Sequence, residues 1–179
     1  MPKSLLGGAS SAAGFDAPLA LLSACHERIA KQCATLRRLP AHLSAHGADA
    51  EAKRAAAQIL RYFDTAGHHH HQDEEQDVFP ALRDAVAGSD AFCLRDMMAR
   101  IAQEHRALDA DWQRLRQQLA AVLAGEATAL DAADVTSFAA RNQRHIAFEE
   151  GEFLPMASRL LDEAQLRTIG QAMRARRGV

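Results

Sequence analysis

Four histidines of this 179-residue chain interrupt the apolar stripes of four separate helical stretches. From Leu94 to Val122, apolar residues recur at alternating steps of four and three, the spacing of one buried helix face, and His105 lies within that series. His26, His70 and His145 hold similar positions in three other stretches. Imidazoles directed into a common core are typical metal ligands, so this pattern predicts a metal site.

Two of these histidines are followed by glutamate one helical turn later. His70 and Glu74, like His145 and Glu149, are four residues apart and therefore share a helix face. The alternative interpretation is a core of hydrogen-bonded histidines, but each unpartnered buried group would cost about 1–3 kcal/mol. We therefore predict six metal ligands: His26, His70, Glu74, His105, His145 and Glu149.

Six ligands exceed the four that a structural zinc ion takes. They suit two metal ions, each bound by two histidines, with both glutamates bridging and an oxo or hydroxo bridge completing the centre. One or two coordination positions would stay open. Nitrogen and carboxylate ligands favour iron, although manganese, zinc and copper also accept them. The predicted cofactor is a pair of non-haem iron ions, with manganese or zinc as alternatives.

The run of four histidines at 68–71 contains more imidazoles than one helix face can direct inward. Consecutive helical residues point about 100° apart, so at most one or two can face the core. His70 continues an apolar stripe, whereas His71 continues a stripe that an aspartate interrupts. We therefore predict the pair His70 and Glu74, and we keep His71 and Glu75 as the alternative pair.

Four further glutamates adjoin the candidate ligands in sequence but fall on other helix faces. We expect them to form salt bridges or hydrogen bonds to the imidazoles instead of binding metal. They are Glu27, Glu75, Glu104 and Glu150.

Helices must position these residues. The first predicted helix starts near Pro18, and the second covers about 49–79, with a break or kink at Pro80. The third ends near 124, before Gly125, and the fourth covers about 131–154. A short final helix is capped by Asp162. Pro40 and Gly47 are expected to flank the first loop. Each half of the chain carries a lone histidine followed by a His-x-x-x-Glu motif, so each half is predicted to be one helical hairpin. The expected fold is all-α, an up-down-up-down four-helix bundle with a short extra C-terminal helix.

Composition limits the class of protein. There are 21 Lys and Arg against 23 Asp and Glu, so no basic excess favours nucleic-acid binding. We expect residues 1–14 to form a flexible arm and 15–179 to form one domain. No apolar run is long enough to cross a membrane. Three cysteines without a C-x-x-C motif are expected to be free thiols, and the predicted location is the cytoplasm. The arginines at 174, 176 and 177 are expected to be solvated or to complement a helix dipole.

The motifs resemble those of hemerythrin-like (HHE cation-binding) proteins over about residues 16–178. They are His26-Glu27-Arg28-Ile29, His70-x-x-x-Glu74-Glu75-x-x-x-Phe79-Pro80, Glu104-His105-Arg106 and His145-x-x-x-Glu149. The resemblance implies a non-haem di-iron centre in a four-helix bundle that binds or senses oxygen or nitric oxide. Oxygen-carrying members have a second histidine one turn after the third-helix histidine, where this chain has Asp109. That difference disfavours reversible oxygen carriage and favours redox reactivity or nitric oxide binding.

Two functions therefore remain as hypotheses. The preferred one is a module that binds or senses O₂, NO or redox state, with no protein partner specified. The alternative is a di-iron enzyme or iron-handling protein that reduces NO or peroxide or repairs iron–sulfur clusters. The repair proteins that this chain resembles carry an extra cysteine-containing N-terminal domain, whereas the short arm here has no cysteine. The question of enzyme activity stays open, with a non-enzymatic function favoured.

Overall fold

The computed structural model describes residues 14–86 and 89–179. These residues form helices joined by turns, with no strand among them, which confirms the predicted all-α class. Residues 1–13, nearly all of the predicted N-terminal arm, lie outside the described residues. Within the described ranges, no helix combines the length and the apolar character that a membrane crossing requires.

The helical segments fall into four long rods and one shorter helix. In chain order they are α1 (Pro18–His46); α2 (Ala50–Tyr62), η1 (Phe63–Gly67), α3 (His68–Gln72), η2 (Asp73–Val78) and α4 (Phe79–Ala85), which follow one another without a break; α5 (Ser89–Ala124); α6 (Ala132–Phe148), η3 (Glu149–Phe153) and α7 (Leu154–Leu160), also without a break; and α8 (Glu163–Arg176). The segments labelled η are π-helical turns, which are wider than α-helical turns.

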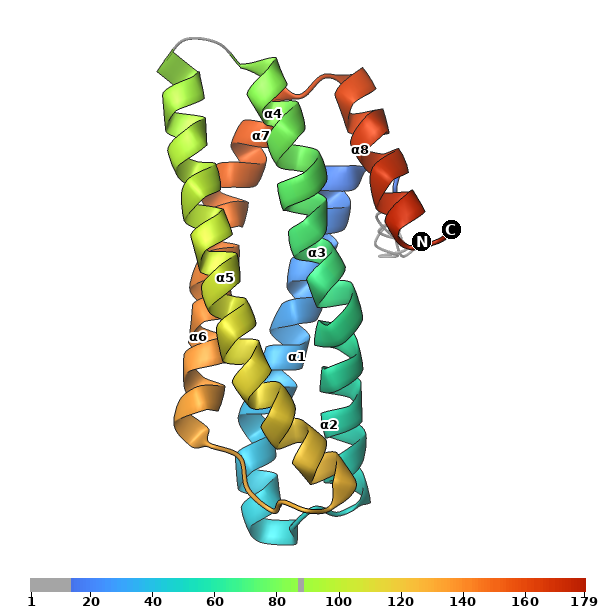
Figure 1. The fold of residues 1–179 in the computed structure, drawn as a ribbon, viewed down its shortest axis with the longest axis vertical. Helices are drawn as coiled ribbons and strands as arrows, with labels where there is room; N and C mark the ends of the chain where they lie inside the picture. The colour runs from blue at the N-terminus through green and yellow to red at the C-terminus, as the bar shows by residue number, and fades with distance from the viewer. Residues whose placement is uncertain (1–13, 87–88) are drawn as a thin grey trace, which may run out of the picture.

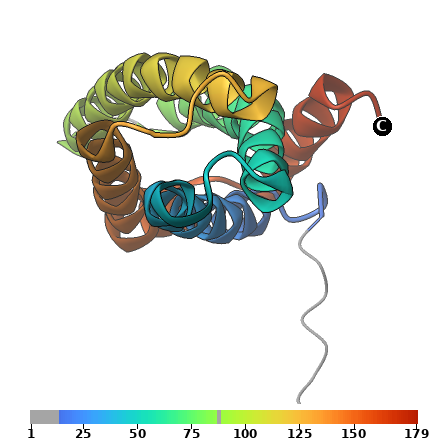
Figure 2. The same cartoon turned by 90° about the horizontal axis from the view of Figure 1, so that it is seen from below.

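The four rods pack side by side around a common interior (Figures 1 and 2). α1 contacts α2 and α6, and α5 contacts the same two helices from the opposite side. Rods that follow one another along the chain run in opposite directions (Figure 1). α8 lies outside this ring, where it packs on α1 and η2.

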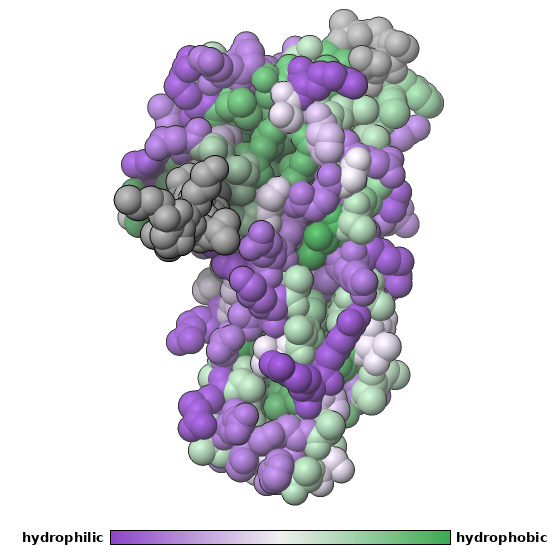
Figure 3. Space-filling view, turned by 180° about the vertical axis from the view of Figure 1, so that it is seen from behind, coloured by the Kyte–Doolittle hydropathy of each residue, from purple (hydrophilic) through white to green (hydrophobic). Residues whose placement is uncertain are grey.

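Apolar residues fill the interior in two clusters. The cluster nearer the α1–α2 turn includes Leu36, Ile59, Leu115 and Phe138, and the cluster nearer α7 and α8 includes Leu22, Leu82, Ile101 and Phe153. Burial of each such side chain contributes about 1.5–3 kcal/mol. The candidate histidines lie between the two clusters in sequence on every rod. On the rear of the molecule, hydrophilic residues cover much of the surface, and hydrophobic residues gather near its upper end (Figure 3).

Three helix ends follow the predicted signals. Asp162 accepts a hydrogen bond from the Gln165 backbone N–H, and the Gln165 side chain accepts one from the Asp162 backbone N–H, forming a capping box. Gly125 follows α5 with φ of +80°, a conformation that favours glycine. Asp131 caps α6 through the N–H groups of Ala133 and Asp134.

The prediction of a loop from Pro40 to Gly47 is wrong, because α1 continues through Pro40 as far as His46. Proline removes one intrahelical hydrogen bond. Leu39 and Leu43 on either side of it are nevertheless buried in the core, and their packing favours continuation of the helix. The turn begins at Gly47, whose φ is +66°.

Pro80 and Pro155 also stand within continuous rods, which end neither at them nor just before them. In both rods the turn before the proline is π-helical. A proline ring crowds the carbonyl four residues earlier and cannot donate a hydrogen bond, so a widened turn accommodates it. The two halves of the chain therefore share an irregularity that the simple 3.6-residue repeat does not describe.

Candidate metal centre

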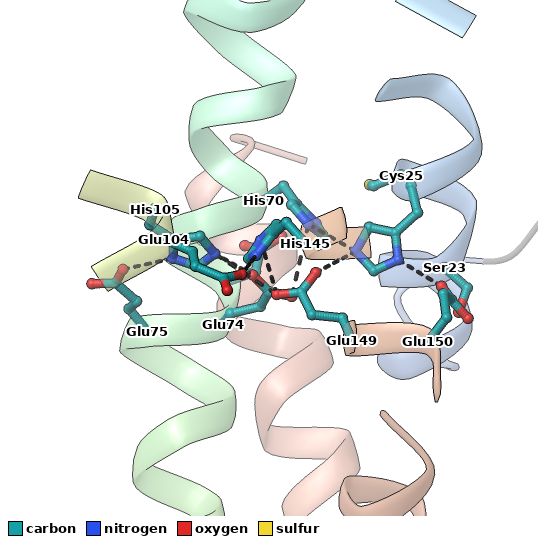
Figure 4. A network of polar contacts seen from close by, with 12 residues as sticks. Ser23, Cys25, His70, Glu74, Glu75, Glu104, His105, His145, Glu149 and Glu150 are labelled. Carbon is teal, nitrogen blue, oxygen red and sulfur yellow. Dashed lines mark hydrogen bonds and ion pairs between the residues drawn. The ribbon is translucent and has the colours of Figure 1, made fainter. Parts of the chain in front are cut away.

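The six predicted ligands meet in one buried layer between the two apolar clusters (Figure 4). Each of the six is at most 3% exposed. His26 comes from α1, His70 from α3, His105 from α5 and His145 from α6. The sequence thus brings one imidazole from each rod to the same depth.

The two glutamates lie at the centre of this layer. The Nε2 atoms of His26 and His145 lie 2.9 and 3.1 Å from the two oxygens of Glu149. The Nε2 atom of His105 lies 3.2 Å from Oε2 of Glu74. The His70 Nε2 is 3.7 Å from Oε1 of Glu74. Each carboxylate therefore faces imidazoles that come from different rods.

The ligand atoms divide into two overlapping groups of four, in each of which all atoms lie within 4.8 Å of one another. One group is His26, His70, Glu74 and Glu149, and the other is Glu74, His105, His145 and Glu149. Both groups contain the same two glutamates. The geometry thus provides two adjoining positions that share two carboxylates.

Several polar atoms in this layer make no hydrogen bond to the rest of the described chain. They are both oxygens of Glu74 and Glu149, Nε2 of His105 and His145, and Nδ1 of His70 and His71. Although some of these atoms lie close together, their directions do not suit hydrogen bonding. Buried polar atoms are normally partnered, and each unpartnered one costs about 1–3 kcal/mol. The donor set therefore fits metal ions bound through imidazole nitrogen and carboxylate oxygen.

Three outer carboxylates hold the opposite ring edge of three histidines. The Nδ1–H groups donate to carboxylate oxygens in the pairs His26–Glu150 at 2.6 Å, His105–Glu75 at 2.7 Å and His145–Glu104 at 2.8 Å. These bonds fix the tautomer that leaves Nε2 facing the centre. The prediction that neighbouring glutamates contact imidazoles is confirmed for these three, whereas Glu27 is exposed to solvent.

Charge in the layer is balanced between the inner carboxylates and the imidazoles. Burial opposes protonation of His26 and His105, but the surrounding carboxylates outweigh it and raise the pKa of His26 to about 9 and that of His105 to about 11. Burial likewise opposes ionisation of Glu149, yet contacts with His105, His145 and His26 hold its pKa well below its ordinary value. Burial and the neighbouring charge of Glu149 raise the pKa of Glu74 to about 7.

His71 lies closer to the centre than its helical stripe predicted, which corrects the sequence interpretation. Its ring stacks on His105 with 3.9 Å between ring centroids, and its side chain is only 18% exposed. The reason is the π-helical turn η1, which contains one residue more than an α-helical turn. This turn places Gly67 on the buried face and moves the following histidines round the helix. The alternative pair is not formed, because Glu75 contacts His105 from outside the layer.

The prediction that the C-terminal arginines are solvated is wrong for two of the three, because Arg174 alone is half exposed. Arg176 and Arg177 are mostly buried at the side-chain level and bind Asp73, which is fully buried and directly precedes Glu74. Arg176 also contacts Asp77 at 2.6 Å. These contacts join the end of α8 to the π-helical turn that carries Glu74. They pair residues about a hundred positions apart, which local periodicity cannot indicate.

A cavity of about 230 Å³ lies beside the layer, between η1, α3, α5 and α6. Phe63, Trp112 and Phe138 contribute apolar wall, whereas His71 and Asp109 contribute polar groups. The Asp109 side chain is 58% exposed, with an oxygen 3.7 Å from Nδ1 of His71. Asp109 is absent from the groups of candidate ligands found among the described residues.

A known protein family and an individual bacterial protein are similar to this chain. Residues 17–157 match the family described as the hemerythrin HHE cation binding domain. An uncharacterized protein of Haemophilus influenzae is similar to this chain, with 31% identity over 167 residues. The match spans 93% of this chain and 94% of that protein.

Proposed function

We propose that this chain, which belongs to the hemerythrin HHE cation-binding family, holds two non-haem iron ions and uses them to bind or sense O₂ or NO. The supporting observation is the pair of four-residue groups that share Glu74 and Glu149. In this proposal the four rods form an up-down-up-down four-helix bundle, with α8 as the extra helix. His26 and His70 serve one metal position, and His105 and His145 serve the other.

A pair of iron ions supplies reversible redox change and open coordination positions for small molecules. The chain's own residues tune this chemistry. Glu75, Glu104 and Glu150 accept hydrogen bonds from three imidazoles, which orients their Nε2 atoms and raises their basicity. The apolar clusters on both sides of the layer limit the access of water.

The cavity beside His71 provides a route for a small molecule from solvent toward the layer. Its apolar wall of Phe63, Trp112 and Phe138 suits an uncharged diatomic molecule. Asp109 stands at its polar side, at the position where oxygen-carrying hemerythrins have a histidine. Because Asp109 replaces that histidine, the centre is expected to favour redox response or NO binding over oxygen carriage.

The test is the optical spectrum of the reduced, iron-loaded protein when O₂ or NO is admitted without air, with the metal-free chain as the control. The proposal expects a spectral change that either reverses under vacuum or is complete after one equivalent of O₂ or NO has been added. Continuous consumption of NO or peroxide would instead support the enzyme alternative. Absence of any spectral response to O₂ and NO would contradict the proposal.

A further inference from the structure

One imidazole beside the candidate centre has no part in the six-residue ligand set. His71 packs face to face with His105, with an angle of 15° between the ring planes, and its ring lies 6.1 Å from that of His145. Its Nδ1 atom is buried and makes no hydrogen bond within the described chain. A buried ring nitrogen without a hydrogen-bond partner itself indicates a missing contact.

His71 also belongs to a third group of candidate ligand atoms. The atoms offered by His71, His105 and His145 all lie within 4.8 Å of one another. Nitrogen atoms that bind one ion at about 2.1 Å are at most about 4.2 Å apart. A shift of a few tenths of an ångström, together with a rotation of the His71 ring out of its stacked position on His105, would therefore bring the three nitrogen atoms to a common ion.

The two metal positions are unequal in this respect. Among the described residues, no further imidazole forms a group of candidate ligands with His26 and His70. The two histidines of the other position, His105 and His145, form such a group with His71. The cavity lies on the same side, since His71 is one of its lining residues. The metal position that has the additional imidazole is therefore also the one next to the cavity, through which a small molecule would arrive.

We propose that His71 is a fifth histidine ligand, which binds the ion held by His105 and His145 and makes the two metal positions unequal. This inference rests on the proposed two-metal centre. The chain would then take its additional imidazole from α3, next to His70, instead of from α5, where Asp109 stands. The π-helical turn η1 makes this arrangement accessible, because it lets two consecutive histidines reach the same layer.

The test is a titration of the metal-free full chain with Co²⁺, followed by visible absorption, which reports both the number of bound ions and their coordination. The wild-type chain is expected to bind two ions in two separable steps. In His71→Ala, one of the two steps should weaken by about tenfold or more, and its absorption band should change. The other step should keep its wild-type affinity.

His68→Ala is the matched control, because His68 lines the same cavity but is exposed and lies outside the three groups of candidate ligands. It should titrate as the wild type does. His71→Asn provides a second variant, with a polar side chain of smaller size, should the alanine variant lose helix content by circular dichroism. It is expected to show the same selective weakening.

The outcomes separate this inference from the proposed function. If the wild type binds two ions and both His71 variants titrate identically to it, His71 is not a ligand and only this inference fails. Equal weakening of both steps would also contradict it, since the assignment concerns one position. Binding of fewer than two ions by the wild type would overturn the two-metal centre itself, and the assignment of His71 with it.

Discussion

Arg177 donates a hydrogen bond of 2.6 Å to the fully buried carboxylate of Asp73, and so links the C-terminal end of α8 to the residue that precedes Glu74. Arg176 binds the same carboxylate. Two cations thus neutralise one buried charge within the π-helical turn that presents a candidate bridging ligand. This contact joins a helix outside the four-rod ring to the turn that carries Glu74.

The first prediction concerns this contact. Asp73→Ala removes the buried partner of two arginines that retain some contact with solvent, so we expect a loss of about 2–4 kcal/mol in the free energy of unfolding. Denaturant unfolding of the metal-free protein measures it. Arg167→Ala is the control, because its salt bridge with Glu163 is exposed and should contribute less than about 1 kcal/mol. Equal losses in the two variants would show that the Asp73 network adds no special stability.

The second prediction tests the shared carboxylates. Glu149→Gln keeps the size of the side chain but removes the negative charge that two metal positions would share, so the number of bound iron ions should fall below two per chain. Metal analysis after gel filtration measures the ratio. Glu152→Gln, an exposed change in the same π-helical turn, should retain the wild-type ratio. Two retained ions in Glu149→Gln would show that Glu149 is not a bridging ligand.

The third prediction concerns the outer carboxylates. Glu104→Gln weakens the acceptor for His145 Nδ1–H, and we expect metal affinity to fall about 10–100-fold without loss of stoichiometry. Competition with a chelator measures this change. Glu27→Gln, which adjoins His26 but faces solvent, should have no effect. An affinity unchanged by Glu104→Gln would mean that this hydrogen bond does not tune the ligand.

The sequence predicted the six residues of the layer because each had a local signature. A histidine within an apolar series, or a His-x-x-x-Glu pair on one helix face, can be recognised from helical periodicity alone. The same reasoning underestimated the burial of the His71 ring, since periodicity assumes 3.6 residues per turn and η1 is wider. It also failed at Pro40, where burial of Leu39 and Leu43 favours the helix over the local effect of proline.

Contacts between distant residues were the other part that the sequence did not reveal. Asp73 and Arg177 are far apart in the chain, and nothing near either residue indicates the other. Glu75 was expected to contact an imidazole, but its partner is His105 on another rod and not a histidine beside it. Such pairings depend on how the rods are rotated relative to one another, which only the packed structure specifies.

The fourth prediction follows from the raised pKa values of His26 and His105, about 9 and 11. Both pKa values exceed the ordinary histidine value, so both imidazoles are expected to be in the doubly protonated, positively charged form at pH 7 in the metal-free protein. A metal ion must displace these protons, and loading should therefore release about two protons per chain from these residues. Apparent metal affinity should consequently rise as the pH increases from 6 toward 9.

Calorimetric metal titration in two buffers with different ionisation enthalpies measures this release. The metal-free protein itself has the opposite dependence. Because the folded pKa of each imidazole lies above its unfolded value, the resulting stabilisation is complete below pH 6.5 and is lost as the pH rises through 9 and then 11. Metal binding without proton release at pH 7 would contradict the proposed charge state of the layer.

The central claim is that Glu74 and Glu149 join two metal positions in one layer. The most direct test is an anaerobic titration of the metal-free full chain with Fe²⁺, with iron per chain determined after removal of unbound metal. We predict saturation at two iron ions per chain. Saturation at one ion, or no retained iron, would contradict the account.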